Sequence, residues 1–295
     1  ELGEPEAVVT GLAERNLVTA SETLLLADYS LERNLLTDVR YRAFGALARI
    51  AETEGAPADL LFRILWRHNV VAHERGKYEE ALEYAMKMEE ALNGMKSSDE
   101  TLRGRADNRL AVAYRKLMRS VDAETARGYG EKALYYAAEA LSIMEGILPA
   151  SNPELWQLYD NMEKVHEYRG EWKAAIDFGK KRIDAIEAAL DGWNPLLASA
   201  YNNTAIVLRE DGQEEASVSF SEHAMEIVSR SLDPNHIEMA YANWTLANTY
   251  DKFGKPEEAA ASIRKTIAIL RKLLPPDHPN LSMAEKTLAG FLEKL

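Results

Sequence analysis

Histidine is the side chain most often used as a metal ligand or general base, so its spacing is the first chemical signal to test. No two histidines form the His-Glu-x-x-His pattern that places two ligands on one helix face. There are no cysteines, which excludes disulfides, thiolate metal sites and cysteine nucleophiles. The sequence therefore predicts no metal site and no cofactor. The six histidines are His68, His73, His166, His223, His236 and His278.

Other catalytic patterns are also missing from the sequence. There is no glycine-rich phosphate loop and no Gly-x-Ser-x-Gly motif. The acid pairs Glu79-Glu80 and Glu257-Glu258 fall at predicted helix starts, where carboxylates favour the helix dipole. We therefore expect no catalytic residues, and the sequence predicts that the chain is not an enzyme.

Polar residues recur at a fixed interval in the second half of the chain. Asn152, Asn194, His236 and His278 are each 42 residues apart, and Pro follows three of them. Asn accepts hydrogen bonds from the free N–H groups at a helix start, and Pro at the first helical position has no N–H to lose. Each of these positions thus predicts the start of a helix. His is a poorer cap than Asn, so neighbouring residues are expected to share the capping at the two histidines.

Glycines recur with the same interval. Gly128, Gly170, Gly212 and Gly254 are 42 residues apart, and each lies between two segments with helical periodicity. Gly76 stands in the same context further upstream. Because Gly adopts the left-handed conformation that closes a helix, each is expected to form a tight turn between antiparallel helices. The predicted unit is cap, helix, Gly turn, helix, and the fold class is all-α.

These signals divide the chain into three parts. Residues 1–58 have no clear register and are expected to form two or three helices that cover one end of the array, or a degenerate repeat. The last part, 279–295, is a single helix that caps the other end. Between them, residues 59–278 are expected to form five helix pairs, at about 60–92, 105–148, 153–190, 195–232 and 237–274.

The second repeat is longer than the others. From Gly76 to Gly128 is 52 residues, and the ten extra residues fall between Tyr114 and Gly128. Few helix breakers occur there, so a lengthened helix is one interpretation. The alternative is that residues 118–127 form a projecting element that contacts a partner.

The combination of small residues in the first helix, a Gly turn and an acidic start to the second helix resembles the tetratricopeptide repeat. A 42-residue period with "PDHP" linkers and "YNNTA" in the first helix is similar to the repeats of kinesin light chains. This closer likeness covers 149–295, and 60–148 match only the general motif. The resemblance implies a right-handed α-solenoid that acts as a protein-interaction scaffold, binding an extended peptide or partner segment in its concave groove.

The resemblance also implies which residues line that groove, because first helices form its wall and residues spaced by three and four share a helix face. The family's Asn positions match Asn202 and Asn203, and more loosely Asn161 and Asn108. The first two repeats contribute three arginines and no acid to this face, and Arg forks suit carboxylates. We therefore expect a partner of acidic character. The candidate peptide-binding residues are Arg63, Trp66, Arg105, Asn108, Arg115, Asn161, Lys164, Asn202, Asn203, Arg209, Trp244 and Asn248.

Other interpretations of these residues remain open. A polar residue on a helix face is most often simply solvated, and Trp66 and Trp244 fit the core between repeats equally well. The basic stretch "RILWRHN" fits pairing with the acids of "YEEALEYAMKMEEAL" instead of a ligand. An alternative function is a structural, self-associating or sensor segment of a larger signalling protein, as a homo-oligomer or within a multidomain chain.

Bulk composition narrows the partner classes. The 295-residue chain has a net charge of −13, which argues against nucleic acid and against anionic membranes as partners. No run approaches the roughly 18 apolar residues of a membrane span. We expect a cytoplasmic protein. Because the sequence begins at Glu1 and not at Met, we expect a fragment or a processed product, which leaves room for a removed signal peptide.

Overall fold

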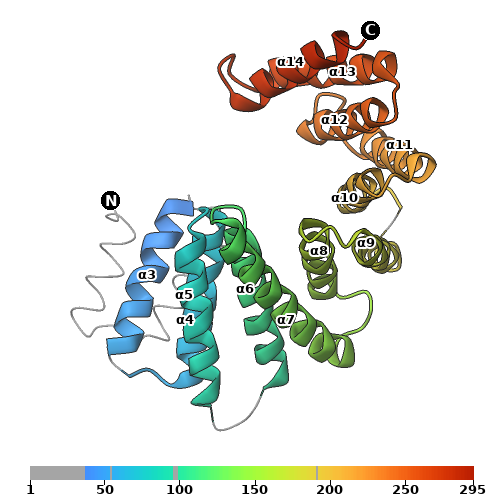
Figure 1. Cartoon of the computed structure of the whole chain (residues 1–295). Coiled ribbons are helices and arrows are strands. Elements are labelled where there is room, and N and C mark those ends of the chain that lie inside the picture. Colours follow the sequence, from blue (N-terminus) through green and yellow to red (C-terminus); the bar gives the residue numbers. More distant parts are fainter. Residues whose placement is uncertain (1–36, 54, 96–98, 191) are drawn as a thin grey trace. The chain divides into compact units, whose positions relative to one another are not determined.

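The computed structural model describes residues 37–295 except for 54, 96–98 and 191. Within these described residues the secondary structure consists of twelve helices, α3 to α14, and contains no strand (Figure 1). Consecutive helices pack as antiparallel pairs, so the predicted all-α solenoid is confirmed. The chain divides into two compact units, residues 1–147 and 148–295.

The first compact unit contains five described helices that pack in chain order. Its core contains Phe44, Leu47, Phe62 and Met88, all at most 2% exposed. Besides these sequential contacts, the first helices of its two pairs, α4 and α6, touch each other. The helices are α3 (Thr37–Thr53), α4 (Ala58–Glu74), α5 (Tyr78–Asn93), α6 (Glu100–Leu117) and α7 (Ala123–Ile147).

The second compact unit contains seven helices, again packed in chain order. Small residues such as Ala175, Ala205 and Ala247 are fully buried between them, which lets neighbouring helices approach closely. The unit ends with a single helix, α14, that packs on α13. The helices are α8 (Pro153–Tyr168), α9 (Trp172–Glu187), α10 (Pro195–Glu210), α11 (Glu214–Ser231), α12 (Ile237–Lys252), α13 (Pro256–Leu273) and α14 (Pro279–Leu292).

The four residues spaced by 42 all cap helices, as predicted. The Oδ1 atoms of Asn152 and Asn194 accept from the amides two residues on, at 2.9 and 3.0 Å. His236 and His278 do the same through Nδ1, both at the longer distance of 3.2 Å. In front of His236, Asp233 Oδ1 accepts from the amide of Asn235 at 2.8 Å; this bond lies outside the helix, so the expected sharing of the cap by a neighbour stays a prediction.

Four of the five predicted turn glycines have the left-handed backbone, with φ between 71° and 79°, at Gly76, Gly170, Gly212 and Gly254. The prediction for Gly128 is wrong, because this residue lies inside α7. The turn of the second repeat is formed by residues 118–122 instead. The sequence does not distinguish a Gly inside a helix from a Gly that ends one. The 42-residue interval between Gly128 and Gly170 therefore led to the wrong prediction.

Of residues 118–127 in the second repeat, 118–122 form the turn and 123–127 begin α7, so the second helix of this repeat is lengthened. Helix α7 has 25 residues, against 16 in α9. Asp122 caps its start, with Oδ1 accepting from the amides of Glu124 and Thr125 at 3.0 Å each. Of the expected end segments, α3 and α14 are seen, whereas the prediction for residues 1–36 lies outside the described residues.

Candidate functional site

A basic surface lies on the first helices of the first compact unit, α4 and α6. Arg63 and Arg67 on α4, and Arg105 and Arg109 on α6, are each four residues apart and therefore share a helix face, and Lys116, seven residues after Arg109, lies on the same face of α6. Arg63 is exposed and the others are partly buried. We call this surface the basic face; it consists of Arg63, Arg67, Arg105, Arg109, Arg115 and Lys116.

The positive charge of this surface contributes to the lowered pKa of His73. His73 lies at the C-terminal end of α4, and its ring is 5.5 Å from that of Tyr78. Its pKa is lowered to about 4, mainly by burial and then by the charges of Lys116, Arg109 and Arg115 on α6. His73 is therefore neutral at pH 7, and its Nε2 atom is buried without a hydrogen-bond partner among the described residues.

The remaining candidates of the first compact unit are less accessible. Asn108 is 9% exposed and offers almost no surface to a ligand. Its neighbour Asp107 is buried too, and burial raises the pKa of that carboxyl to about 6. Trp66 is half-buried against the core, with the guanidinium of Arg67 5.1 Å from its ring centroid. Part of Trp66 thus belongs to the core, as the alternative interpretation held.

The proposed pairing between the basic stretch of α4 and the acids of α5 holds for His68. Its Nε2 atom is 2.9 Å from Glu80 Oε1, and Tyr41 donates to Glu80 Oε2 at 2.5 Å. Burial lowers the pKa of His68, against the opposing effect of Glu80. This cluster attaches α3 to the first helix pair, so we assign it a structural role.

The candidates of the second compact unit are largely engaged with their neighbours. Asn161 is 4% exposed and therefore removed from the surface. Lys164 Nζ donates to both carboxylate oxygens of Asp160, at 2.7 and 2.6 Å, and Asn203 donates to the same carboxylate at 3.4 Å. By contrast, Asn202 Oδ1 is buried without a hydrogen-bond partner among the described residues.

The last three candidates lie toward the end of the chain. Arg209 donates to Glu210 Oε1 at 2.9 Å, so its charge is already balanced. Trp244 packs, partly buried, against the core of the last helices, and Asn248 is also partly buried. The predicted set is thus divided between the two compact units, with five members in the first and seven in the second.

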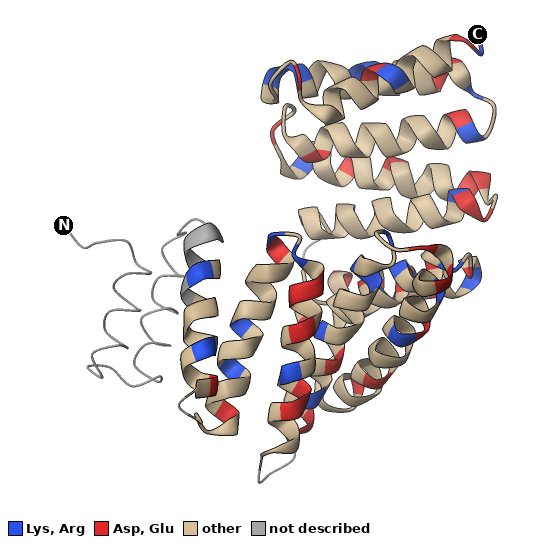
Figure 2. Ribbon diagram, turned by 60° about the vertical axis from the view of Figure 1, so that its left-hand side comes forward, with Lys and Arg blue, Asp and Glu red and all other residues tan. Residues whose placement is uncertain are grey.

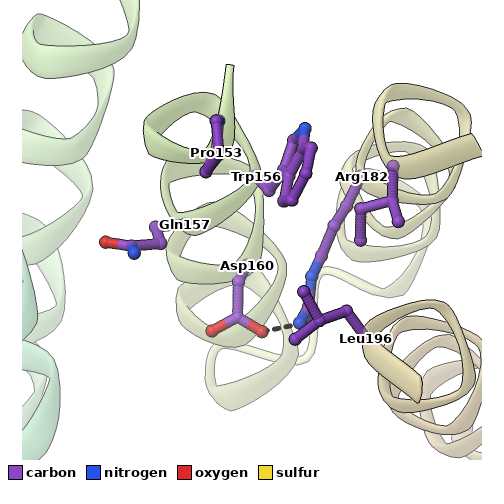
Figure 3. Close-up of a pocket in the computed structure, with 7 residues that line it drawn as sticks. Pro153, Trp156, Gln157, Asp160, Arg182 and Leu196 are labelled. Atoms are coloured by element: carbon purple, nitrogen blue, oxygen red, sulfur yellow. Dashed lines mark hydrogen bonds and ion pairs between the residues drawn. The ribbon is translucent and has the colours of Figure 1, made fainter. Parts of the chain in front are cut away.

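A pocket opens between α8, α9 and α10 in the second compact unit, with a volume of about 200 Å³ (Figure 3). Its walls are mostly apolar, and its polar side is the ion pair between Arg182 Nη1 and Asp160 Oδ1 at 2.6 Å. The lining residues are Pro153, Trp156, Gln157, Asp160, Arg182, Ile186 and Leu196.

The pocket was not predicted from the sequence, because only the faces of the first helix in each repeat were considered. Arg182 lies on α9, a second helix, and it reaches back to a first-helix carboxylate. Trp156 is only 8% exposed, and its Nε1 atom is buried without a hydrogen-bond partner among the described residues. The sequence feature that could have indicated the pocket is an arginine, Arg182, on a second helix.

Behind the pocket lies a fully buried carboxyl group, that of Glu163. It is 0% exposed; Oε1 accepts from Thr204 Oγ1 at 3.0 Å, while Oε2 is 3.9 Å from Arg182 Nη1. Burial raises the pKa of Glu163 to about 8, because it disfavours the charged form more than Arg182 favours it. The side chain is therefore mainly neutral at pH 7.

Two exposed apolar side chains, Trp193 and Leu196, lie beside the pocket. Trp193 and Leu196 are 40% and 51% exposed, and Arg230 stacks on Trp193 with its guanidinium 3.9 Å from the ring centroid. The positions 42 residues before and after each of them are polar, as Ser151 and Glu154 show. The fourth repeat thus exposes large apolar side chains where its sister repeats expose polar ones.

Two kinds of site are not found in the described part of the chain. The His, Asp and Glu side chains that the structure describes contain no cluster of three or more able to hold a metal ion. Similarly, none of the described helices is both long and apolar enough to cross a membrane.

Comparison with known proteins places this geometry in a family of repeats. Residues 196–272 match the family model described as tetratricopeptide repeat. None of the curated protein sequences compared with the chain matches it.

Solved structures are similar in fold, at low sequence identity. Kinesin-light-chain-like repeats from Podosopora anserina have a TM-score of 0.61 and 18% identity, covering 74% of this chain and 99% of that one. BtubC from P. vanneervenii has a TM-score of 0.61 and 16% identity, covering 89% and 95%. A Rap protein complexed with competence and sporulation factor has a TM-score of 0.60 and 14% identity, covering 98% and 88%.

Residues 196–272, which include α10 to α12 and most of α13, are therefore tetratricopeptide repeats. The described helices share the fold of the kinesin-light-chain-like repeats.

Proposed function

We propose that this chain is a scaffold whose basic face binds an extended, acidic segment of a partner protein. The tetratricopeptide repeat fold generally serves as a protein-interaction scaffold, and proteins built from it are typically not enzymes. The similar Rap structure was solved in complex with a factor, which supports a binding role for such a fold. The cytoplasm remains the predicted location.

The observation that carries the proposal is the charge of α6. This helix has five cationic and two acidic residues in a chain whose net charge is −13. Figure 2 shows Lys and Arg in blue and Asp and Glu in red along the ribbon. One of the two acids, Asp107, is buried, and its raised pKa of about 6 leaves it mainly ionised at pH 7, so α6 keeps an excess of three positive charges. The neighbouring His73 stays uncharged, partly because the same cations surround it. An acidic segment would complement the positive charge of this face.

The second support is the arrangement of the two helices. Because α4 and α6 are in contact, their cationic faces belong to one surface that an extended segment can follow across two repeats. Each well-made charge-assisted hydrogen bond contributes about 1.5–3 kcal/mol. Exposed pairs contribute less and are screened by salt. The expected complex is therefore sensitive to ionic strength.

The test uses a fluorescent peptide rich in Glu and its Gln-substituted counterpart as probes, titrated with the full chain. We expect the Glu peptide alone to bind, with affinity that falls as salt rises. The double variant Arg105→Glu and Arg115→Glu should abolish this binding while the helical melt stays near that of the parent chain.

A matched control separates local contact from overall charge. Arg264 and Lys265 are exposed residues of α13, and changing both to Glu alters the net charge by the same amount. This control should bind the Glu peptide nearly as well as the parent chain. Equal loss in both double variants would show that only net charge matters, and unchanged binding in the α6 variant would refute the basic face as the site.

A further inference from the structure

We infer that Glu163 is a proton-operated switch for the pocket: when its carboxyl group ionises, Arg182 is drawn from Asp160 and the pocket wall rearranges. The inference concerns the second compact unit, so it is independent of the basic face on α4 and α6.

The position of Arg182 between two carboxyl groups is the basis of the switch. Its Nη1 atom is 2.6 Å from Asp160 Oδ1, in the pocket wall, and 3.9 Å from Glu163 Oε2, behind the wall. Glu163 Oε2 is buried and has no hydrogen-bond partner among the described residues. An ionised carboxylate in that place needs a cation, and Arg182 is the cation that already lies nearest to it in the described ion pairs.

The groups around Glu163 come from three helices. On its own helix, α8, Asp160 repels the ionised form and Lys164 favours it. On α9, Arg182 favours it, and on α10 Thr204 donates a hydrogen bond at 3.0 Å. Burial outweighs the favourable contributions and raises the pKa to about 8, so the change of charge falls in mildly alkaline solution.

The repeats themselves indicate that the fold accommodates this carboxyl group specifically. One and two periods later, the position of Glu163 is taken by Ala205 and Ala247, which are 0% exposed. Facing it is Gly179, where a methyl group would come within 2.7 Å of Glu163 Oε1 and would collide with Thr204. The next repeat has Ser221 at the position of Gly179. A larger residue at 163 is thus matched by a smaller one at 179.

Titration of Glu163 has a defined effect on folding. Its pKa in the folded chain is higher than the value of 4.5 expected when unfolded. The stabilisation from the buried neutral carboxyl group is therefore complete below pH 4.5 and is lost as pH rises through about 8. Relative to a variant that cannot titrate, the folding equilibrium constant should fall by up to tenfold per pH unit within that window.

The experiment follows the pocket and the fold together. Trp156 lines the pocket, so its emission is obtained as the difference between the full chain and Trp156→Phe, from pH 6.5 to 9.5. We expect a transition centred near pH 8 that is absent in Glu163→Gln. Urea melts over the same series should show the pH dependence in the parent chain alone.

A second variant keeps the test decisive if Glu163→Gln folds poorly. The variant Glu163→Ala, with Gly179 unchanged, copies Ala205 of the fourth repeat and adds no atom near Thr204, so it should fold and show no transition. A transition that persists in either variant would refute the assignment to Glu163. The absence of any transition in the parent chain would refute the switch itself.

Discussion

Gly170 and Gly128 hold equivalent places in the sequence period, yet the structure predicts opposite effects when each is replaced by Ala. Gly170 has φ 72°, in the left-handed region, whereas Gly128 lies within α7. Neither site is sterically closed to a methyl group: the nearest atom to a Cβ at Gly170 is 3.7 Å away, and nothing lies within 4 Å of one at Gly128. The difference between the two is therefore one of backbone conformation.

The magnitudes follow from that conformation. A left-handed Ala costs about 1–2 kcal/mol, and the stiffer unfolded chain returns roughly 0.4–1 kcal/mol of this. Gly170→Ala should therefore lower the free energy of unfolding by about 1 kcal/mol. In the middle of a helix, Ala is favoured over Gly by roughly 0.8–1 kcal/mol. Gly128→Ala should therefore raise the free energy of unfolding by a similar amount.

Urea melts followed by helical circular dichroism at fixed pH would measure both changes. Because repeat arrays can unfold in steps, amide hydrogen exchange at each turn should accompany the melts. Gly170→Asn is a useful control, since Asn tolerates the left-handed region and should cost less than Ala. Changes of the same sign in the two Ala variants would show that the assigned backbone conformations are wrong.

Three further outcomes are expected. Asn194→Ala should cost about 1 kcal/mol in thermal stability, and His236→Ala less because its capping bond is longer; an equal cost would contradict the cap distances. Asp107 has a pKa raised to about 6, so stability should fall as pH rises from about 4 through 6, and Asp107→Asn should reduce that slope in urea melts, leaving the part that Glu163 contributes. A chelator should leave the melting temperature unchanged, and a clear drop with EDTA would reveal a missed metal site.

The fold was predictable because its signals are local. A cap such as Asn152 and a turn such as Gly212 depend on a few neighbouring residues, and the fixed period repeats each signal several times. The prediction failed at Gly128, where the period was broken by ten extra residues. There the true turn contains no Gly, and Asp122 supplies the cap from its side chain.

The candidate site was predictable only in part, because helical spacing gives the face of a residue and not its depth. Arg63 is exposed on its first helix, whereas Asn161 is also on a first helix but buried. The pairing of Arg182 with Asp160 joins residues 22 positions apart on two helices, and no local pattern shows it. Glu163 was detectable in principle, as the odd residue in a column otherwise occupied by Ala.

The Glu163–Thr204 hydrogen bond also fixes the order of the repeats. Thr204 is replaced one period later by Leu246 and one period earlier by Met162, neither of which can donate to a carboxyl group. If the third repeat paired with the fifth during folding, a buried carboxyl group would meet a leucine and stay unsatisfied. Repeats of one fold can assemble out of sequence, and this bond is one contact that only the correct neighbour supplies. Deleting the fourth repeat should therefore cost more than the loss of one helix pair.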